Sequence, residues 1–486
     1  MERSISPQRV ATLVDSFDRR PAYAGLAEAL RLAISDGRIP HDTRLPSERD
    51  LMTTLGVSRT TITRAYAVLR ERGYTAARQG SGTFTRIPGG RARSLDRVLS
   101  PRSEDESVID LNCAATAAAP GVAAAYEAAV AELPAYLSGH GYYPAGLPEL
   151  QRAVAASYDA RGLPTQPDQI MITPGSLAAT AVVARSLVRP GDRVLVETPV
   201  YPNAPLSFAG AGGRLVTTPI DDAGWDLETL EATLRRSAPK VSYLIADFQN
   251  PTGHLLDDAA RTRVATALAR SRSIAVVDES HQQLALEGQR MPAPLASYVE
   301  GAGGEAITVG GASKTYWGGL RIGWVRAPLS RIGALTEARL TLDLGVPVLE
   351  QLVLARLLAG PDEALESHRR RLREQRDALA SALSEKLPDW SYRLPAGGLA
   401  MWCQLPAPLA TLVAAEAELR GVVISPGPVF APQGGLASRV RIPWTRPTEE
   451  LLEAVDRLAE AWGAAVQTAG VQIPAGPARN RRAMVA

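Results

Sequence analysis

Four polar side chains lie close behind runs of apolar residues that have the length of buried strands. Asn250 lies in QNPTG after VSYLIADF, Asp278 ends SIAVVD, and Lys314 follows AITVGGAS, with Arg321 seven residues further on. Open parallel sheets bind ligands outside the carboxyl ends of their strands. We therefore expect one crevice to bring together this amine, carboxylate, amide and guanidinium.

Lys314 stands out because lysine is rare in this chain. The 53 basic residues include three lysines, Lys240, Lys314 and Lys386, so the other 50 (53 − 3) are arginine. A lysine differs from an arginine chiefly because it can lose its proton and act as a nucleophile. Lys240, before a strand, and Lys386, on a charged helix, are ordinary surface positions. Lys314 is thus the predicted chemical lysine.

Pyridoxal phosphate (PLP) needs this set of groups. A lysine forms a Schiff base with its aldehyde, and a carboxylate pairs with the pyridinium nitrogen so that the ring withdraws electrons. An arginine binds phosphate in a bidentate manner, and backbone N–H groups at a helix N-terminus add to it. The turn TPGS, with Gly175 and Ser176, supplies such a terminus, and Tyr201 in ETPVYP could stack on the ring or be a core aromatic.

The elements that must position these residues alternate between helices and short buried strands. IMIT, RVLVE, GRLVTTPI, VSYLIAD, SIAVVD and AITVGG are the expected strands, which predicts an α/β domain with a mostly parallel sheet. We expect this domain over residues 110–466, with a smaller α+β lobe from about Pro361. Residues 467–486 are predicted to be a disordered tail.

The first part of the chain differs in charge and pattern. Residues 1–94 hold 16 arginines and 9 acidic residues, a local charge of +7, so the rest of the chain carries −5 of the net +2. A basic block on an acidic body suggests a polyanion-binding module. Residues 87–109, polar and rich in Gly, Pro, Ser and charge, are the predicted linker behind it.

Residues 1–86 predict a winged helix-turn-helix that binds DNA. Helical periodicity covers AYAGLAEALRLAISDG, SERDLMTTLG and SRTTITRAYAVLRERG, and YTAARQGSGTFTR has the pattern of a hairpin. Because a recognition helix presents its first turns to the major groove, the candidate DNA contacts are Ser58, Arg59, Thr60, Thr61, Thr63 and Arg64. Arg49 and the wing glycines Gly80 and Gly82 would approach the DNA backbone, and Arg59 is the best candidate for reading guanine.

The motifs GYYPAGLPELQ, TPGS, VLVETPVYP, QNPTG, VVDES, SKTYWGGLRIGW and VRI resemble, in this order, those of fold-type I aminotransferases. Ahead of them, LPSERDLMTTLGVSRTTITRAYAVLRERGY and GSGTF resemble the GntR-type winged helix. The whole chain therefore looks like a MocR-family transcriptional regulator. The resemblance implies a PLP-dependent transferase fold with a large α/β domain and a small α+β lobe.

The same resemblance implies roles for single residues. Lys314 would form the Schiff base, Asp278 would pair with the pyridinium nitrogen, Asn250 would contact the ring hydroxyl, and Tyr201 would stack on the ring. The phosphate would lie among Gly175, Ser176, Ser313 and Arg321, and Tyr142 would reach the phosphate of the partner subunit in a homodimer. Arg441, with Arg439 as a neighbour in a competing register, falls where the family binds a carboxylate of a substrate or effector.

Three positions depart from the family pattern. Leu177 stands where a polar residue is frequent, and Gly311 where a phosphate-binding Ser or Thr is common. His281 replaces a tyrosine that touches the ring hydroxyl, so it is either a cofactor contact or a polar packing residue. These departures concern the tightness of phosphate binding, and they leave the lysine, the carboxylate and the arginine in place.

The prediction is a cytoplasmic, homodimeric regulator that binds an operator in double-stranded DNA and senses an amine or amino-acid effector, or PLP itself, through the Lys314 aldimine. Two alternatives stay open: an active aminotransferase with a DNA-binding domain, and a repressor whose second domain has lost the cofactor and only dimerises. The two cysteines and five scattered histidines suggest neither disulfides nor a metal site. A signal peptide and a membrane span are not expected.

Overall fold

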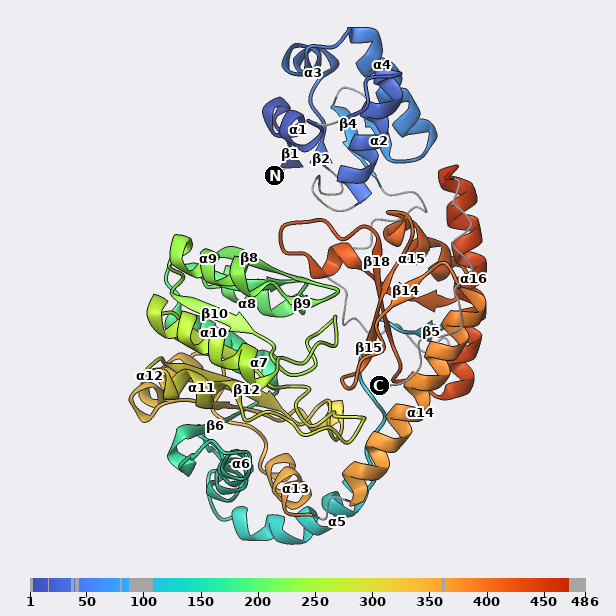
Figure 1. Cartoon of the computed structure of the whole chain (residues 1–486). Helices are drawn as coiled ribbons and strands as arrows, with labels where there is room; N and C mark the ends of the chain where they lie inside the picture. Colours follow the sequence, from blue (N-terminus) through green and yellow to red (C-terminus); the bar gives the residue numbers. More distant parts are fainter. Residues whose placement is uncertain are drawn as a thin grey trace.

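The computed structural model describes residues 3–15, 17–35, 39, 43–78, 81–86, 108–360 and 363–471. The described residues up to 86 form the N-terminal domain (Figure 1). Its helices are α1 (Pro7–Leu13), α2 (Ala22–Ser35), α3 (Glu48–Leu55) and α4 (Arg59–Glu71). Its strands β1 (Arg3–Ser4), β2 (Thr43–Arg44), β3 (Thr75–Arg78) and β4 (Gly82–Thr85) form one sheet in the order β1-β2-β4-β3.

Local sequence explains this domain. The Ser47 and Ser58 hydroxyls accept hydrogen bonds from Asp50 N and Thr61 N and so cap α3 and α4. Gly56 ends α3 in the left-handed conformation, with φ 64°. The predicted face of α4 is buried, and β3 and β4 form the predicted hairpin. Helix α1 and the short strands β1 and β2 were not predicted.

An eight-stranded sheet forms the large domain, in the order β6-β13-β12-β11-β10-β7-β8-β9. The strands are β6 (Ile170–Thr173), β7 (Arg193–Thr198), β8 (Arg214–Asp221), β9 (Gly224–Trp225), β10 (Val241–Leu244), β11 (Ile274–Asp278), β12 (Ala306–Gly311) and β13 (Gly323–Arg326). Its centre is parallel, as predicted, and β13 and β9 pair antiparallel with their neighbours. These two strands were absent from the predicted set.

Helices cover both faces of this sheet, so its strands are apolar on both sides. One face packs against α7 (Ser176–Leu187), α8 (Asn203–Gly210) and α12 (Leu329–Leu340). The other packs against α5 (Val122–Glu132), α6 (Pro148–Ala160), α9 (Leu227–Ser237), α10 (Asp258–Ser271), α11 (Leu295–Gly301) and α13 (Val348–Ala359). Short 3-10 turns are η2 (Leu133–Tyr136), η3 (Pro167–Gln169), η4 (Gly318–Leu320) and η5 (Gly427–Phe430).

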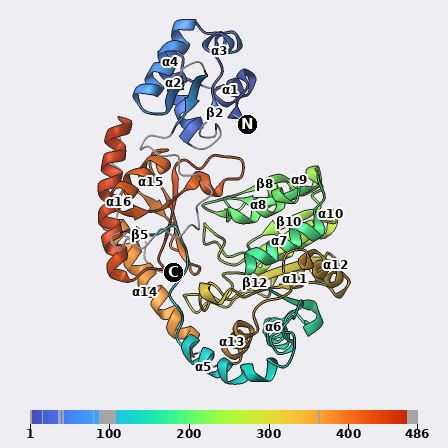
Figure 2. The same ribbon diagram turned by 180° about the vertical axis from the view of Figure 1, so that it is seen from behind.

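The small lobe lies beside the large sheet in both views of the molecule (Figures 1 and 2). It contains α14 (Glu363–Lys386), α15 (Ala410–Leu419) and α16 (Thr448–Ala469), and a sheet of β14 (Ser391–Tyr392), β15 (Ala400–Gln404), β18 (Arg439–Pro443) and β17 (Ser425–Pro426). Strand β5 (Ile109–Asp110) also belongs to it, because β5 pairs with β16 (Val422–Val423). The lobe is therefore built from two distant parts of the chain.

The ends of the predicted segments differ slightly from the elements found. Ile109, placed in the linker, belongs to β5, and α16 extends to Ala469, into the segment predicted as a tail. Gly80, residues 87–107 of the linker and residues 472–486 of the tail lie outside the described residues. Among the described helices, none combines the length and apolar character that a membrane crossing requires.

Candidate functional site

Lys314 lies in the turn that follows β12, at the carboxyl end of the parallel strands. Its side chain is partly buried, and Nζ donates a hydrogen bond to the carbonyl oxygen of Ala114 at 2.8 Å. Burial lowers the pKa of Lys314, and the positive charges of Arg441 and Arg321 lower it further, while Asp278 acts in the opposite direction. A lysine with a lowered pKa is a better nucleophile at neutral pH.

Asp278 ends β11 and is 7% exposed. Its Oδ2 accepts a hydrogen bond from the Tyr243 hydroxyl at 2.6 Å, and Oδ1 accepts one from Ser280 N at 2.8 Å. These two hydrogen bonds fix the direction of the carboxylate. Strand β11 pairs in parallel with β12, so Asp278 lies at the same edge of the sheet as the turn that carries Lys314.

Asn250 and Arg441 meet across the boundary between the large domain and the small lobe. Arg441 Nη1 donates to Asn250 Oδ1 at 3.2 Å, and Nη2 donates to the carbonyl oxygen of Asn112 at 2.5 Å. Arg441 is 2% exposed, its guanidinium lies over the Phe430 ring at 4.8 Å, and its Nε has no hydrogen-bond partner among the described residues. A buried donor of this kind can take a carboxylate oxygen.

Arg439, the neighbour in the competing register, has a different partner. Arg439 forms an ion pair with Asp222 at 2.8 Å, on a side chain that is 74% exposed. Burial lowers the pKa of Arg441 to about 10, so this guanidinium stays positive at neutral pH. Arg441 is therefore the arginine that faces the site.

A second group of residues forms a cradle at the N-terminus of α7. Arg321, in the left-handed conformation at φ 51°, donates from Nη2 to the carbonyl oxygen of Pro174 at 3.1 Å. A Cβ on Gly175, which has φ 98°, would lie 3.0 Å from that Nη2 atom, so the glycine leaves the guanidinium its place. A Cβ on Gly311 would lie 3.4 Å from Ser176 N, so β12 borders the same cradle.

Tyr201 and His281 surround the same crevice. Tyr201 is partly buried, its hydroxyl accepts a hydrogen bond from Asn203 Nδ2 at 2.9 Å, and burial raises its pKa to about 12. His281 Nδ1 lies 3.0 Å from the carbonyl oxygen of Phe248. Burial and the nearby Lys314 lower the pKa of His281 to about 4, which keeps the imidazole neutral.

Two predicted residues are less involved in the crevice of this chain. Ser313 precedes Lys314 and is partly buried. Tyr142 is 58% exposed, and its ring stacks on His140 at 5.7 Å between centroids. Its contacts in the described residues do not include Lys314, Asp278 or Arg321, so the structure of one chain does not bring Tyr142 to them.

Sequence reasoning missed the segment that follows β5. Asn112 lies between Arg441 and the Ser425 hydroxyl, which donates to Asn112 Oδ1 at 2.5 Å. Cys113, which is partly buried, lies between Asn112 and Ala114, and the carbonyl oxygen of Ala114 accepts the hydrogen bond from Lys314. No local motif marks these residues, because their partners lie more than 300 positions further along the chain or, for Lys314, about 200.

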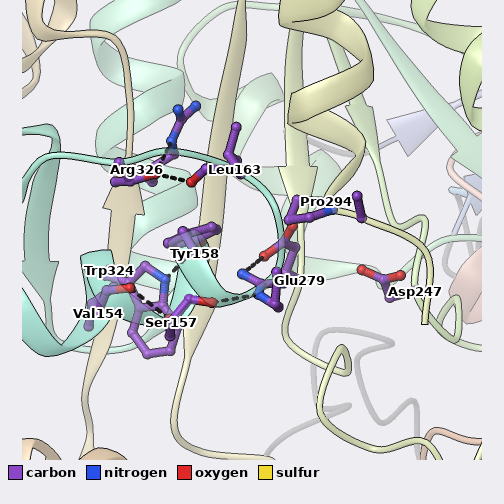
Figure 3. A network of polar contacts seen from close by, with 12 residues as sticks. Val154, Ser157, Tyr158, Leu163, Asp247, Glu279, Pro294, Trp324 and Arg326 are labelled. Carbon is purple, nitrogen blue, oxygen red and sulfur yellow. Dashed lines mark hydrogen bonds and ion pairs between the residues drawn. The ribbon is translucent and has the colours of Figure 1, made fainter. Parts of the chain in front are cut away.

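A buried polar network supports the strand ends from behind. Arg161 Nη2 donates to Glu279 Oε2 at 2.8 Å, and its guanidinium lies 4.5 Å from the centre of the Tyr158 ring. The Trp324 indole donates to the Tyr158 hydroxyl at 3.0 Å, as Figure 3 shows. Glu279 directly follows Asp278, so this network ties the end of β11 to α6.

The predicted DNA contacts gather at the start of α4. The Ser58 hydroxyl lies 2.8 Å from those of Thr60 and Thr61, and the Thr63 hydroxyl donates to Glu48 Oε2 at 2.9 Å. Arg59 is 76% exposed, with Glu48 Oε2 at 3.5 Å.

The other predicted DNA contacts differ in the neighbours that surround them. The Arg64 guanidinium lies over the Tyr23 ring at 4.3 Å, and both Arg64 and Arg49 are exposed. Gly82, with φ 109°, faces Arg44, whose Nε would lie 3.1 Å from an added Cβ. The small residue in the wing therefore leaves room for an arginine beside it.

Comparisons with known proteins match both parts of the chain. Residues 123–458 match the family described as aminotransferase class I and II, and residues 22–85 match bacterial regulatory proteins of the gntR family. The chain is 32% identical to 2-aminoadipate transaminase of Thermus thermophilus, over 63% of this chain and 78% of that protein. It is 27% identical to the HTH-type transcriptional regulator TauR of Rhodobacter capsulatus, over 87% of this chain and 93% of that protein.

A solved structure shows the same fold. It is LysN, an α-aminoadipate aminotransferase of Thermus thermophilus in complex with N-(5'-phosphopyridoxyl)-L-leucine, with a TM-score of 0.70 and 30% identity over 77% of this chain and 96% of that one. The predicted fold class, an N-terminal helix-turn-helix region joined to a fold-type I aminotransferase structure, is confirmed.

Proposed function

Because the chain belongs to the aminotransferase class I and II family and begins with a GntR-type helix-turn-helix region, we propose that it is a PLP-dependent transcriptional regulator. Its N-terminal domain binds operator DNA, and its aminotransferase-like domain senses an amine, an amino acid or PLP. The observation that carries this proposal is that Asp278 and Lys314 lie at the carboxyl ends of the neighbouring parallel strands β11 and β12. Lys314 and Arg441 donate hydrogen bonds to Ala114 O and Asn112 O, two residues apart, in a chain that also has a helix-turn-helix.

The residues of the crevice fit PLP. When bound, PLP supplies an aldehyde that reacts with amines and a ring that withdraws electrons. Lys314 provides the amine, and Asp278, held by Tyr243, provides the carboxylate for the ring nitrogen. Arg321 and the backbone N–H groups at the start of α7 provide the phosphate cradle, in which Gly175 leaves space for the guanidinium. Tyr201, Asn250 and the neutral His281 would contact the ring.

Arg441 is proposed to bind the carboxylate of an amino-acid effector. Its Nε is a buried donor without a partner in the described residues, and its other nitrogens hold Asn112 O and Asn250 Oδ1. Asn112 follows β5, the element that enters the domain directly from the linker to the DNA-binding part. A carboxylate that competes for Arg441 would weaken its hydrogen bond to Asn112 O. The effector would then act on the DNA-binding domain through the backbone of the segment that contains Asn112. A coupling of about 1–3 kcal/mol would suffice for regulation.

DNA binding is proposed to use the exposed start of α4. Arg59 can turn from Glu48 toward a guanine edge, because their 3.5 Å ion pair is exposed and weak. Thr60, Thr61, Thr63 and Arg49 would contact phosphates.

A homodimer is supported by exposed apolar side chains at the end of α5 and the loop after it, and at the end of α12 and the loop after it. Val130, Leu137 and Tyr142 are 54%, 70% and 58% exposed, and Leu340, Leu342 and Leu344 are 48%, 54% and 48% exposed. The two loops touch, since Arg339 donates to the carbonyl oxygen of Pro144 and a Cβ on Gly345 would lie 2.8 Å from Tyr143 O. A contiguous apolar patch of this kind is typical of an interface, and a second copy would bring Tyr142 toward the partner's cradle.

The test is the visible absorbance of the purified protein with added PLP, measured together with DNA binding. Wild type should show the absorbance of lysine-bound PLP, and an amine or amino acid that shifts it should also change DNA affinity. Lys314→Ala should lose both responses and keep DNA binding, whereas the matched variant Lys240→Ala should keep all of them. A Lys314→Ala protein that still responds to the effector would refute the sensing role.

An active aminotransferase is the second candidate function. It is favoured by the complete set of lysine, carboxylate and two arginines in the crevice, together with the similarity to 2-aminoadipate transaminase. Multiple turnovers with an amino acid and a keto acid would establish it. A single half-reaction without turnover would favour the regulator.

A further inference from the structure

Glu197 is a buried carboxylate close to the crevice that no predicted role includes. It lies near the end of β7, in the motif ETPVYP, and is 0% exposed. Oε1 accepts hydrogen bonds from Trp225 Nε1 at 2.8 Å and Ile245 N at 3.2 Å. Oε2 accepts one from Gln249 Nε2 at 3.1 Å. Every one of these partners is a donor, as an ionised carboxylate requires.

Gln249 extends this network to two loops. Its Nε2 also donates to the carbonyl oxygen of Pro199 at 2.8 Å. Its Oε1 accepts hydrogen bonds from Thr252 N at 3.1 Å and Thr252 Oγ1 at 2.8 Å. The amide therefore has one orientation, because turning it over would set its NH2 group against Thr252 N and would remove the hydrogen bonds from Gln249 to Glu197 Oε2 and Pro199 O.

The two loops are those that carry the proposed ring contacts. Pro199 lies two residues before Tyr201, and Gln249 lies directly before Asn250. The backbone here is under strain, since Phe248 has φ 47°, a left-handed conformation that a bulky residue rarely adopts. Such strain persists where surrounding contacts hold it, and the Glu197–Gln249 bond is one of these contacts.

We propose that Glu197 is a positioning residue: through Gln249 it fixes the loops of Tyr201 and Asn250 relative to each other, and so the orientation of the PLP ring. This inference rests on the proposed PLP site. Glu197 is not a catalytic residue, because its carboxylate is enclosed by Trp225, Ile245 and Gln249 and acts through them.

Burying a carboxylate costs free energy that a residue with a purely structural role would not require. Burial raises the pKa of Glu197 to about 7, although Trp225, Gln249 and Ile245 lower it, and the nearby Asp278 raises it further. An apolar or amide side chain would avoid this cost of burying a charge. What an amide cannot do is accept hydrogen bonds from both Trp225 and Gln249 through its two ends.

Glu197→Gln tests the inference, because it keeps the shape and sets Nε2 of the new amide against Nε2 of Gln249. We expect the dissociation constant for PLP, measured by visible absorbance, to rise by about tenfold or more, the equivalent of one hydrogen bond to a charged group. The circular dichroism of bound PLP, which reports ring orientation, should change as well. The double variant Glu197→Gln/Gln249→Glu restores a donor–acceptor pair between the two side chains, so it should recover part of the PLP affinity. Recovery should be incomplete, because a glutamate at position 249 cannot donate to Pro199 O.

The matched control is Glu305→Gln, which breaks the ion pair with Arg331 in the same domain. Glu305 precedes β12 and lies at the opposite end of the strands, so PLP affinity should be unchanged. If Glu197→Gln folds poorly, Trp225→Phe removes one donor to the carboxylate and should cause a smaller change in the same direction.

A lower unfolding temperature with unchanged PLP affinity and unchanged circular dichroism would show that Glu197 is only structural, and would overturn the inference. A wild-type protein that shows no visible band with PLP would refute the PLP site itself. The two failures are therefore distinguishable.

Discussion

Replacing Arg161 with methionine should destabilise the large domain strongly. Arg161 provides the one ion pair found for Glu279 among the described residues, and the Glu279 side chain is 3% exposed. Glu279 Oε1 has no hydrogen-bond partner there. Removing the guanidinium therefore leaves a buried carboxylate without compensation, and the expected cost is about 3–5 kcal/mol. Loss of the contact with the Tyr158 ring adds to it.

A double-mutant cycle measures this cost, with unfolding in urea followed by tryptophan fluorescence. Arg161→Met should be less stable than Glu279→Gln, because the charge that it leaves unpaired is the carboxylate of Glu279, 3% exposed, whereas Glu279→Gln leaves the guanidinium of Arg161, which is 20% exposed. Arg161→Met/Glu279→Gln should recover stability relative to Arg161→Met, with a coupling of about 2–3 kcal/mol. Arg263→Met, which breaks the exposed pair with Glu231, is the control and should change stability little.

The pH dependence of this loss has a defined sign. Burial raises the pKa of Glu279, and the positive charge of Arg161 opposes that rise. Without Arg161 the pKa of the folded state rises further above the unfolded value of about 4.3. A raised carboxyl pKa leaves stability intact below the unfolded pKa and removes it as pH rises toward the folded pKa. The deficit of Arg161→Met should thus be small in acid and grow toward neutral pH, and a deficit that shrank with rising pH would refute the reasoning.

Three further changes test other parts of the structure. Arg441→Lys should weaken binding of carboxylate-bearing amino acids by about tenfold or more in absorbance titrations and spare the matching decarboxylated amines; equal weakening of both would contradict the carboxylate role. Ser58→Ala should destabilise the N-terminal domain by about 1 kcal/mol in thermal unfolding through loss of the α4 cap, whereas Ser58→Asp should retain the cap; equal stability of both variants would count against the capping hydrogen bond. Leu342→Arg should shift the protein toward monomer in sedimentation, and Leu452→Arg, on α16 and 44% exposed, should not; an unchanged dimer would move the interface elsewhere.

Sequence alone could predict the residues whose role depends on neighbours within a few positions along the chain. Lys314 is marked by the rarity of lysine, Asp278 by its place at the end of an apolar run, and Ser47 and Ser58 by their places before helices. These signals depend on spacing within a few residues, so they survive without knowledge of tertiary contacts.

Residues whose contacts come from distant parts of the sequence could not be predicted. Arg439 and Arg441 lie two positions apart on β18, and nothing in the local sequence tells which of them faces the site. Only their contacts distinguish them: Arg439 pairs with Asp222, and Arg441 donates to Asn112 O. Arg64 is exposed, and its contact with the ring of Tyr23, on another helix, could not be predicted from local spacing. Glu197 has the sequence pattern of an ordinary strand residue, because its donors come from two other segments of the chain, one with Trp225 and one with Ile245 and Gln249.

The pairing of β5 with β16 also determines when the small lobe can form during synthesis. Ile109 pairs with Val422, so 422 − 109 = 313 residues must be translated before its partner exists. At about 5–20 residues per second this is a wait of roughly 15–60 s. During that time the segment next to Asn112 has neither β16 nor Arg441 to bind. A nascent chain can therefore complete its N-terminal helix-turn-helix domain long before its aminotransferase-like domain.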